Sequence, residues 1–207
     1  MPRPRSLNPI QIASAALAVI DEGGLSALTM RGVAKELNAT AMCLYRYVAD
    51  RDELEALVVE QALTGVDTTA PEDGDWRERV AVLVRRMRVV IGCHPAVVPL
   101  LPVHRHRSPT VLRWTESLLG VLTEAGLDGT RRAVALRALL AYTVGAIQHE
   151  HLAPLAGDGT TAMAALSPAE FPHLAATAAD ARRVDPDAGF DGGLEILLRG
   201  LATELNG

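Results

Sequence analysis

Apolar residues recur along most of this chain with the 3.6-residue period of an α-helix. Between residues 9 and 22, for example, Ile12, Ala16 and Ile20 fall on one face. No stretch alternates apolar and polar residues as a half-buried strand does, and no internal repeat is evident. The pattern predicts an all-α protein with nine to ten helices.

Capping residues mark where the first helices begin. Asn8-Pro9 is an N-cap followed by a proline at the first helical position. Thr29 caps a second, short helix and Thr40 a third, which extends to about residue 47. Asn38 lies in the turn between them, and asparagine tolerates the left-handed conformation that such a turn often needs.

Further capping signals divide the rest of the chain. Asp50 with Glu53 and Asp75 with Glu78 each form a capping box, and the polar stretch 64–74 between them predicts a hinge. Ser167-Pro168 with Glu170 predicts another helix start. The other expected segments are helices at 75–91, 109–125, 130–151 and 190–205, a short or irregular piece at 96–104, and a loop at 155–166.

Charge separates the two ends of the chain. Residues 1–51 hold six basic and four acidic side chains, a net charge of +2, whereas residues 52–207 carry −7. With the hinge, this predicts three parts, at residues 1–50, 51–74 and 75–207, and different functions for the first and the last. The total charge of −5 argues against a protein that coats nucleic acid or membranes.

Several classes of protein are excluded by missing motifs. The two cysteines have no motif spacing and fit a reducing cytoplasm, and no run of 18 apolar residues predicts a membrane span. There is no phosphate-binding loop, nucleophile elbow or dinucleotide fingerprint, so neither an enzyme nor a cofactor is expected. The pairs His104/His106 and His149/His151 are two residues apart, which on a helix turns them to opposite faces, and no metal site is predicted.

The second and third helices are short and joined by a turn of three to four residues, which is the spacing of a helix-turn-helix motif. In this motif the second helix enters the DNA major groove. Arg31 is a candidate for guanine readout, and Arg51 lies where a helix N-terminus and a cation can hold a phosphate. The alternative is a helical hairpin with solvated arginines that binds nothing. The residues left facing outward on the third helix are Thr40, Ala41, Met42, Tyr45 and Arg46.

The stretch Leu28–Leu57 resembles the DNA-binding domain of the tetracycline-repressor (TetR) family. The matching positions are Thr29, Val33-Ala34, Cys43-Leu44-Tyr45, Tyr47-Val48, Asp50-Arg51 and Leu54. Asn38, Cys43 and Tyr47 depart from the family's usual glycine, hydroxyl residue and histidine. The resemblance implies DNA contacts by Thr29, Arg31, Thr40, Ala41, Met42, Cys43, Tyr45, Arg46, Tyr47 and Arg51.

The segments 141–151 and 190–205 resemble two C-terminal helices of the same family, which implies a homodimer joined by a four-helix bundle. An apolar stripe at helical spacing agrees with a dimer interface, although it also suits a helix that faces its own core. Gly193 and Gly200 would let another helix approach closely. The stripe consists of Leu194, Leu197, Leu198, Leu201 and Leu205.

The resemblance implies a helix-turn-helix DNA-binding domain at 1–50, a connecting helix and hinge at 51–74, and a ligand-binding and dimerisation domain at 75–207. It also implies a small-molecule pocket in this last domain. Val66 and Leu101 stand near the places where tetracycline-binding members have histidines, although His104 is close to the second place, so magnesium–tetracycline is not the expected ligand. Each candidate lining residue also suits an ordinary core. The candidates are Met87, Ile91, Leu100, Leu101, His104, Trp114, Leu118, Tyr142, Gln148 and His149.

These observations predict a cytoplasmic, dimeric repressor that a small molecule releases from a palindromic DNA operator. The alternative is a helical small-molecule carrier or sensor without DNA binding. Substitution of Arg31 and Tyr45 would separate the two, since only the repressor would lose DNA binding.

Overall fold

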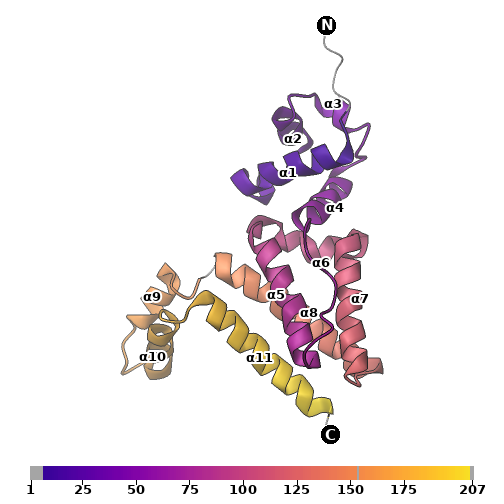
Figure 1. Cartoon of the computed structure of the whole chain (residues 1–207). Helices are drawn as coiled ribbons and strands as arrows, with labels where there is room; N and C mark the ends of the chain where they lie inside the picture. Colours follow the sequence, from indigo (N-terminus) through magenta and orange to yellow (C-terminus); the bar gives the residue numbers. More distant parts are fainter. Residues whose placement is uncertain (1–6, 153, 206–207) are drawn as a thin grey trace. The chain divides into compact units, whose positions relative to one another are not determined.

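The computed structural model describes residues 7–152 and 154–205, and the regular structure within these ranges is helical throughout (Figure 1). This confirms the all-α prediction. No single described helix is long and apolar enough to cross a membrane. The consecutive segments Trp76–Gly92 and Pro95–Arg107 are long and apolar enough only when taken together, and they are bent by 113° relative to each other. The α-helices are α1 Pro9–Gly23, α2 Met30–Glu36, α3 Ala41–Leu44, α4 Arg51–Ala62, α5 Trp76–Gly92, α6 Leu101–His104, α7 Pro109–Glu124, α8 Gly129–Leu152, α9 Asp158–Ala164, α10 Pro172–Ala181 and α11 Pro186–Leu205, and the 3₁₀-helices are η1 Leu25–Ala27, η2 Pro95–Leu100 and η3 Arg105–Arg107.

The predicted N-terminal caps of α1, α2 and α4 are present, whereas the predicted cap of α3 is wrong, because the Thr40 hydroxyl donates to the Cys43 sulfur and accepts no backbone N–H. The Asn8 side chain accepts a hydrogen bond from the Gln11 backbone N–H at 2.8 Å, and the Gln11 side chain accepts one in return from the Asn8 N–H at 3.1 Å. Asp50 accepts from the Glu53 N–H at 2.8 Å, while the Glu53 carboxylate accepts from the Ala49 N–H at 2.7 Å. Each pair satisfies backbone donors that a helix start leaves without partners.

Three predictions in the C-terminal part are wrong. The expected loop at 155–166 contains α9, so the structure has eleven α-helices within the described residues. Ser167-Pro168 starts a single turn, and α10 begins only at Pro172, because a proline five residues into a helix would clash with the preceding turn. The last helix starts earlier than expected, at Pro186, where the Asp185 carboxylate accepts hydrogen bonds from the backbone N–H groups of residues 187 and 188.

The chain divides into two compact units. One contains the residues up to Asp73 together with Val82–Gly120, and the other contains Gly74–Ala81 together with Val121–Gly207. These units are defined by which parts of the chain pack together, whereas the predicted boundaries at residues 50 and 74 divide the chain by the function expected of each part. That division therefore stays a prediction.

In the first unit, α1 packs against α2 and α4, and α4 packs against η2 and α6. The apolar faces that meet there are fully buried: Ile12 and Ile20 come from α1, and Leu54 and Val58 from α4. Burial of a leucine or isoleucine side chain contributes about 1.5–3 kcal/mol, so this small interior holds the helices around α2 and α3 in a fixed arrangement.

The C-terminal end of α4 is tied to the start of α7 by a partly buried carboxylate. Glu60 accepts hydrogen bonds from the Ser108 hydroxyl at 2.5 Å and from the Thr110 hydroxyl at 2.7 Å and backbone N–H at 3.2 Å. Burial raises the pKa of Glu60, but these hydrogen bonds and the charge of Arg113 outweigh it and leave the pKa below its usual value. The ionised carboxylate is therefore the form that stabilises this joint.

In the second unit, α8 packs against α11, and α9 packs against α10. The Tyr142 hydroxyl on α8 donates a hydrogen bond to the Phe190 carbonyl on α11 at 2.5 Å, and the two rings lie 5.4 Å apart. A β-carbon added at Gly193 would lie 2.5 Å from the Tyr142 hydroxyl oxygen. Gly193 therefore leaves the space that Tyr142 occupies.

We expect Glu60→Gln to destabilise the protein by about 1–2 kcal/mol at pH 7, because the amide removes the charge that three donors face. A carboxyl group with a lowered folded-state pKa contributes stability above its unfolded pKa, and that contribution is lost as the pH falls through the folded value. The difference in unfolding free energy between wild type and Glu60→Gln, measured with urea, should therefore shrink from pH 7 towards pH 3. A difference that grows in acid would contradict this assignment.

We expect Gly193→Ala to lower the melting temperature, although alanine in a helix interior is normally favoured over glycine by about 1 kcal/mol. The reason is that the new methyl group would displace Tyr142. The control is Gly192→Ala in the same helix, where an added β-carbon meets no atom within 4 Å. Differential scanning calorimetry of both variants checks this, and equal melting temperatures would show that Tyr142 moves without cost.

Candidate nucleic-acid interface

The turn between α2 and α3 has the geometry that its residues predict. The Thr29 hydroxyl accepts a hydrogen bond from the Gly32 N–H at 2.9 Å and so caps α2. Asn38 has a φ of 51° in the left-handed region, as expected, and the following Ala39 N–H donates to the Ala34 carbonyl at 2.8 Å. The side chain of Leu44 is buried and anchors α3 to the interior of its unit, so that the remaining side chains of α3 face outward.

The outward face of α3 carries two large side chains that a folded protein usually covers. Met42 is 76% exposed and Tyr45 is 51% exposed. Thr40, Cys43 and Arg46 are exposed beside them. Exposed apolar and aromatic groups next to hydroxyl and guanidinium donors suit contact with thymine methyl groups, base edges and phosphates.

The other predicted DNA contacts lie around this face. Arg31, Thr29 and Arg51 are exposed, at the N-terminal ends of α2 and α4. Ala41 and Tyr47 are only half-buried within the protomer. α3 itself is shorter than predicted, because the regular helix ends at Leu44 and residues 45–47 form a turn.

Cys43 differs from an ordinary exposed thiol. The Thr40 hydroxyl donates a hydrogen bond to the Cys43 sulfur at 3.2 Å. This bond, with the Thr40 backbone and the charge of Arg46, lowers the pKa of Cys43 below that of a free cysteine. A lowered pKa increases the thiolate fraction at neutral pH and with it the reactivity towards alkylating reagents.

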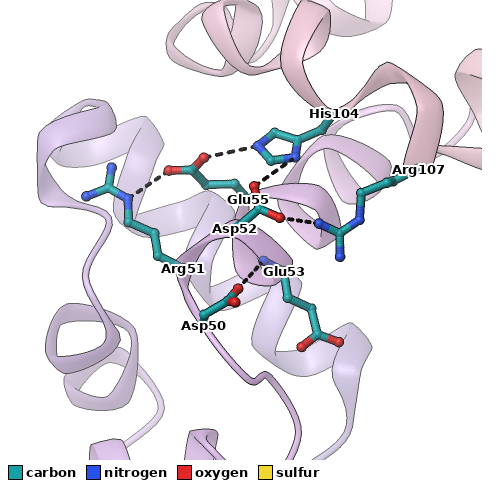
Figure 2. A network of polar contacts seen from close by, with 7 residues as sticks. All are labelled: Asp50, Arg51, Asp52, Glu53, Glu55, His104 and Arg107. Carbon is teal, nitrogen blue, oxygen red and sulfur yellow. Dashed lines mark hydrogen bonds and ion pairs between the residues drawn. The ribbon is translucent and has the colours of Figure 1, made fainter.

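The start of α4 joins this surface to the rest of its unit through charged groups (Figure 2). Arg51 donates from Nε to Glu55 Oε1 at 2.7 Å, and the other oxygen of Glu55 lies 3.0 Å from His104 Nε2. Asp52 accepts a hydrogen bond from Arg107 and lies 3.9 Å from His104 Nδ1. We call the contacts of Asp52, Glu55 and Glu60 with residues 104–110 the α4 seam.

The α4 seam was not predicted from the sequence. Asp52, Glu55 and Glu60 resemble the solvated side of an amphipathic helix, and their partners follow 48 to 55 residues later in the chain. The sequence does show a group of acidic residues on α4 and a group of hydrogen-bond donors at residues 104–110. These two groups are chemically complementary, but the sequence does not show which residue pairs with which.

Two family models match the chain. The model described as "Bacterial regulatory proteins, tetR family" matches residues 12–56, which contain α2, α3 and the start of α4. The model described as "Tetracyclin repressor-like, C-terminal domain" matches residues 68–205. The chain belongs to the TetR family. It is therefore a DNA-binding transcriptional regulator and not an enzyme, and the resemblance inferred from Leu28–Leu57 is confirmed.

Individual TetR proteins are similar over nearly the whole chain. The class A tetracycline repressor of Escherichia coli is 30% identical over 206 residues, which cover 95% of this chain and 91% of the repressor. The crystal structure of apo ActR from Streptomyces coelicolor has a TM-score of 0.82, 28% identity and 99% coverage of both chains. A possible TetR family regulator from the same organism has a TM-score of 0.84 and 34% identity, with 95% of this chain and 99% of that chain covered.

The residues predicted to line a ligand pocket are divided between the two units. Seven of them lie in the first unit and are buried there, and Trp114 Nε1 donates a hydrogen bond to the Leu83 carbonyl at 2.8 Å. Among the seven, His104 faces Glu55 of α4. In the second unit, Tyr142 and Gln148 are half-buried and His149 is exposed. The other six buried residues are Met87, Ile91, Leu100, Leu101, Trp114 and Leu118.

The predicted dimer stripe on α11 also divides into two groups. Leu194 and Leu198 are at most 4% exposed within the protomer, so they face its own interior. Leu197, Leu201 and Leu205 are half-buried. The dimer prediction for α11 thus depends on these three leucines.

In the described part of the chain, no three side chains of the histidine, cysteine or carboxylate type come together in a group that could hold a metal ion.

We expect operator DNA to protect Cys43 from alkylation by N-ethylmaleimide, because a duplex on α3 would cover the thiol. Cys93, at the end of α5, is also exposed and serves as the internal control. Mass spectrometry of the two cysteine peptides, with and without operator, measures both rates in one sample. Equal labelling of Cys43 in both samples would show that DNA does not cover this face of α3.

Proposed function

We propose that this regulator is a cytoplasmic homodimeric repressor whose two α3 helices read successive major grooves of a palindromic operator. The exposed Met42 on α3, and the exposed Tyr45 and Arg46 in the turn directly after it, carry this proposal, together with the buried Leu44 that holds α3 in place. Two such helices meet half-sites that are about 34–36 Å apart on one side of the duplex. The repressor DrrR1 of Streptomyces coeruleorubidus, 30% identical over 153 residues, supports repression over activation.

Arg31 and Arg51 have different roles in this proposal. Arg31, near the N-terminus of α2, is the candidate for bidentate readout of guanine, which discriminates between sequences. Arg51 at the start of α4 contacts a phosphate, which fixes position without reading sequence. Thr29 and Thr40, also exposed, add hydroxyl donors to the backbone contacts.

Dimerisation through α8 and α11 agrees with the exposed residues of these helices. Ile196 on α11 is 65% exposed and Val134 on α8 is 60% exposed. A β-carbon added at Gly200, in the middle of α11, would meet no atom within 4 Å. Glycine at such a position lowers helix stability by about 1 kcal/mol relative to alanine. A partner helix that approaches closely would account for a glycine at this position.

A small organic molecule releases the operator in this proposal. ActR has been crystallised with actinorhodin, and that structure is 28% identical to this chain with a TM-score of 0.81. The buried side chains of Ile91, Trp114 and Leu118 supply the apolar and aromatic surface that such a ligand needs. Binding favours a spacing of the two α3 helices that no longer fits both half-sites. The carrier alternative loses support, because the family model covers α2 and α3 as well as the ligand domain.

Footprinting on the DNA that flanks the regulator's gene, at two salt concentrations, tests the proposed function. We expect a protected palindrome and an affinity that falls steeply with salt, since each neutralised phosphate releases counterions. Absence of binding across a pool of genomic fragments would refute the proposal.

On the operator so identified, we expect Arg31→Ala to weaken binding about 10- to 100-fold, because one bidentate guanine contact accounts for ~1–3 kcal/mol of discrimination. The loss should be larger on the operator than on unrelated DNA. The control is Arg183→Ala, which removes an arginine that is 79% exposed in the turn after α10. Fluorescence anisotropy measures both, and equal losses on operator and unrelated DNA would reassign Arg31 to the phosphate backbone.

A further inference from the structure

A chain of three side chains leads from the surface of α4 into the interior of its unit. Arg51 is 52% exposed, Glu55 is 16% exposed and His104 is 1% exposed. The two oxygens of Glu55 are divided between the other two residues, with Arg51 Nε at 2.7 Å and His104 Nε2 at 3.0 Å (Figure 2). One carboxylate thus contacts both a surface cation and a buried imidazole.

The hydrogen bond between Arg51 and Glu55 leaves Arg51 suited to hold a phosphate. Glu55 takes the Nε–H group, and the contacts drawn in Figure 2 use neither terminal nitrogen of the guanidinium. Those two nitrogens are the donors of a bidentate contact with a phosphate. A free arginine side chain carries ~2 kcal/mol of rotamer entropy, and a guanidinium that is already oriented loses less of it on binding.

The buried end of the chain fixes Glu55. An ionised carboxylate can only accept hydrogen bonds, so Nε2 of His104 carries the proton in this contact. His104 itself is held by its burial at the end of α6 and by Asp52, whose carboxylate lies 3.9 Å from Nδ1. With the histidine fixed, Glu55 has one preferred orientation, and that orientation places Arg51.

We propose that Glu55 is a positioning residue of the DNA interface, which orients Arg51 for a phosphate, and that His104 acts on DNA affinity through Glu55. This inference rests on the proposed contact between Arg51 and DNA. It assigns to His104, which was predicted to bind ligand, a role towards α4. Substitution of His104 would then change the operator affinity although His104 does not touch DNA.

The test is a double-mutant cycle on operator affinity with the full-length protein. Its variants are Arg51→Ala, Glu55→Gln, His104→Gln and the double variant of Arg51 and His104. We expect Arg51→Ala to weaken binding about 10-fold and to lower the salt slope by ~2 for a dimer, one phosphate per protomer. Glu55→Gln and His104→Gln should each weaken binding about 3- to 10-fold, since a charge-assisted hydrogen bond is lost.

The decisive quantity is the effect of His104→Gln in the Arg51→Ala background. If His104 acts through Arg51, its substitution there should change the affinity by less than about 2-fold, because coupled residues are not additive. If His104→Gln acted instead through a general loss of structure, it would weaken binding by the same factor in the wild-type and the Arg51→Ala backgrounds. His94→Gln is the matched control, since His94 Nδ1 lies 2.8 Å from Asp21 of α1 in a second imidazole–carboxylate pair that does not involve Arg51.

Two results would overturn the inference, and they are distinguishable. An unchanged affinity and salt slope in Arg51→Ala would refute the phosphate contact itself. A weakened Arg51→Ala, combined with a full effect of His104→Gln in that background, would leave the proposed function intact and refute the positioning role. If the melting curve shows that His104→Gln does not fold, a double-mutant cycle of Arg51→Ala with Glu55→Gln decides between the same alternatives.

Discussion

The arrangement of the DNA-reading unit depends on α4, which has to satisfy two different neighbours at once. Its apolar side, with Leu54 and Val58 fully buried, packs against α1 and sets the position of the helix-turn-helix segment. Its carboxylates meet hydroxyl, imidazole and guanidinium groups of residues 104–110. The first contact is non-directional and holds the helices together, whereas the second is directional and specifies one alignment of α4. A helix fixed in both ways transmits a displacement of either neighbour.

The weak overall charge makes the placement of each cation important. A protein with a net charge of −5 gains little from long-range attraction to DNA, so its affinity depends on a few cations at defined positions. Arg31 and Arg46 are exposed beside the face that we propose reads DNA, and Arg51 donates a hydrogen bond to Glu55 of its own helix. Two copies of this surface in a dimer would double the number of such contacts without a strongly basic protomer.

The sequence predicted local features well and long-range ones poorly. The caps at Asn8, Thr29 and Asp50 were predictable because an N-cap and its partner are three residues apart. The left-handed turn at Asn38 was predictable because asparagine itself tolerates this backbone conformation. The pairing of Glu55 with His104 was not, since proximity across 49 residues is set by the packing of whole helices. The family resemblance predicted the DNA-binding face, but the burial of Leu194 and its neighbour Leu198 appeared only in the structure.

The polar composition of the α4 seam has a thermodynamic consequence. Separation of two apolar surfaces raises the heat capacity, whereas exposure of polar surface lowers it. Movement of α4 that separates the carboxylates, hydroxyls and guanidinium groups of the seam would therefore lower the heat capacity, the opposite of what separation of an apolar contact does. The enthalpy of that movement would then fall as the temperature rises. The seam would then hold α4 without the weakening on cooling that apolar contacts show.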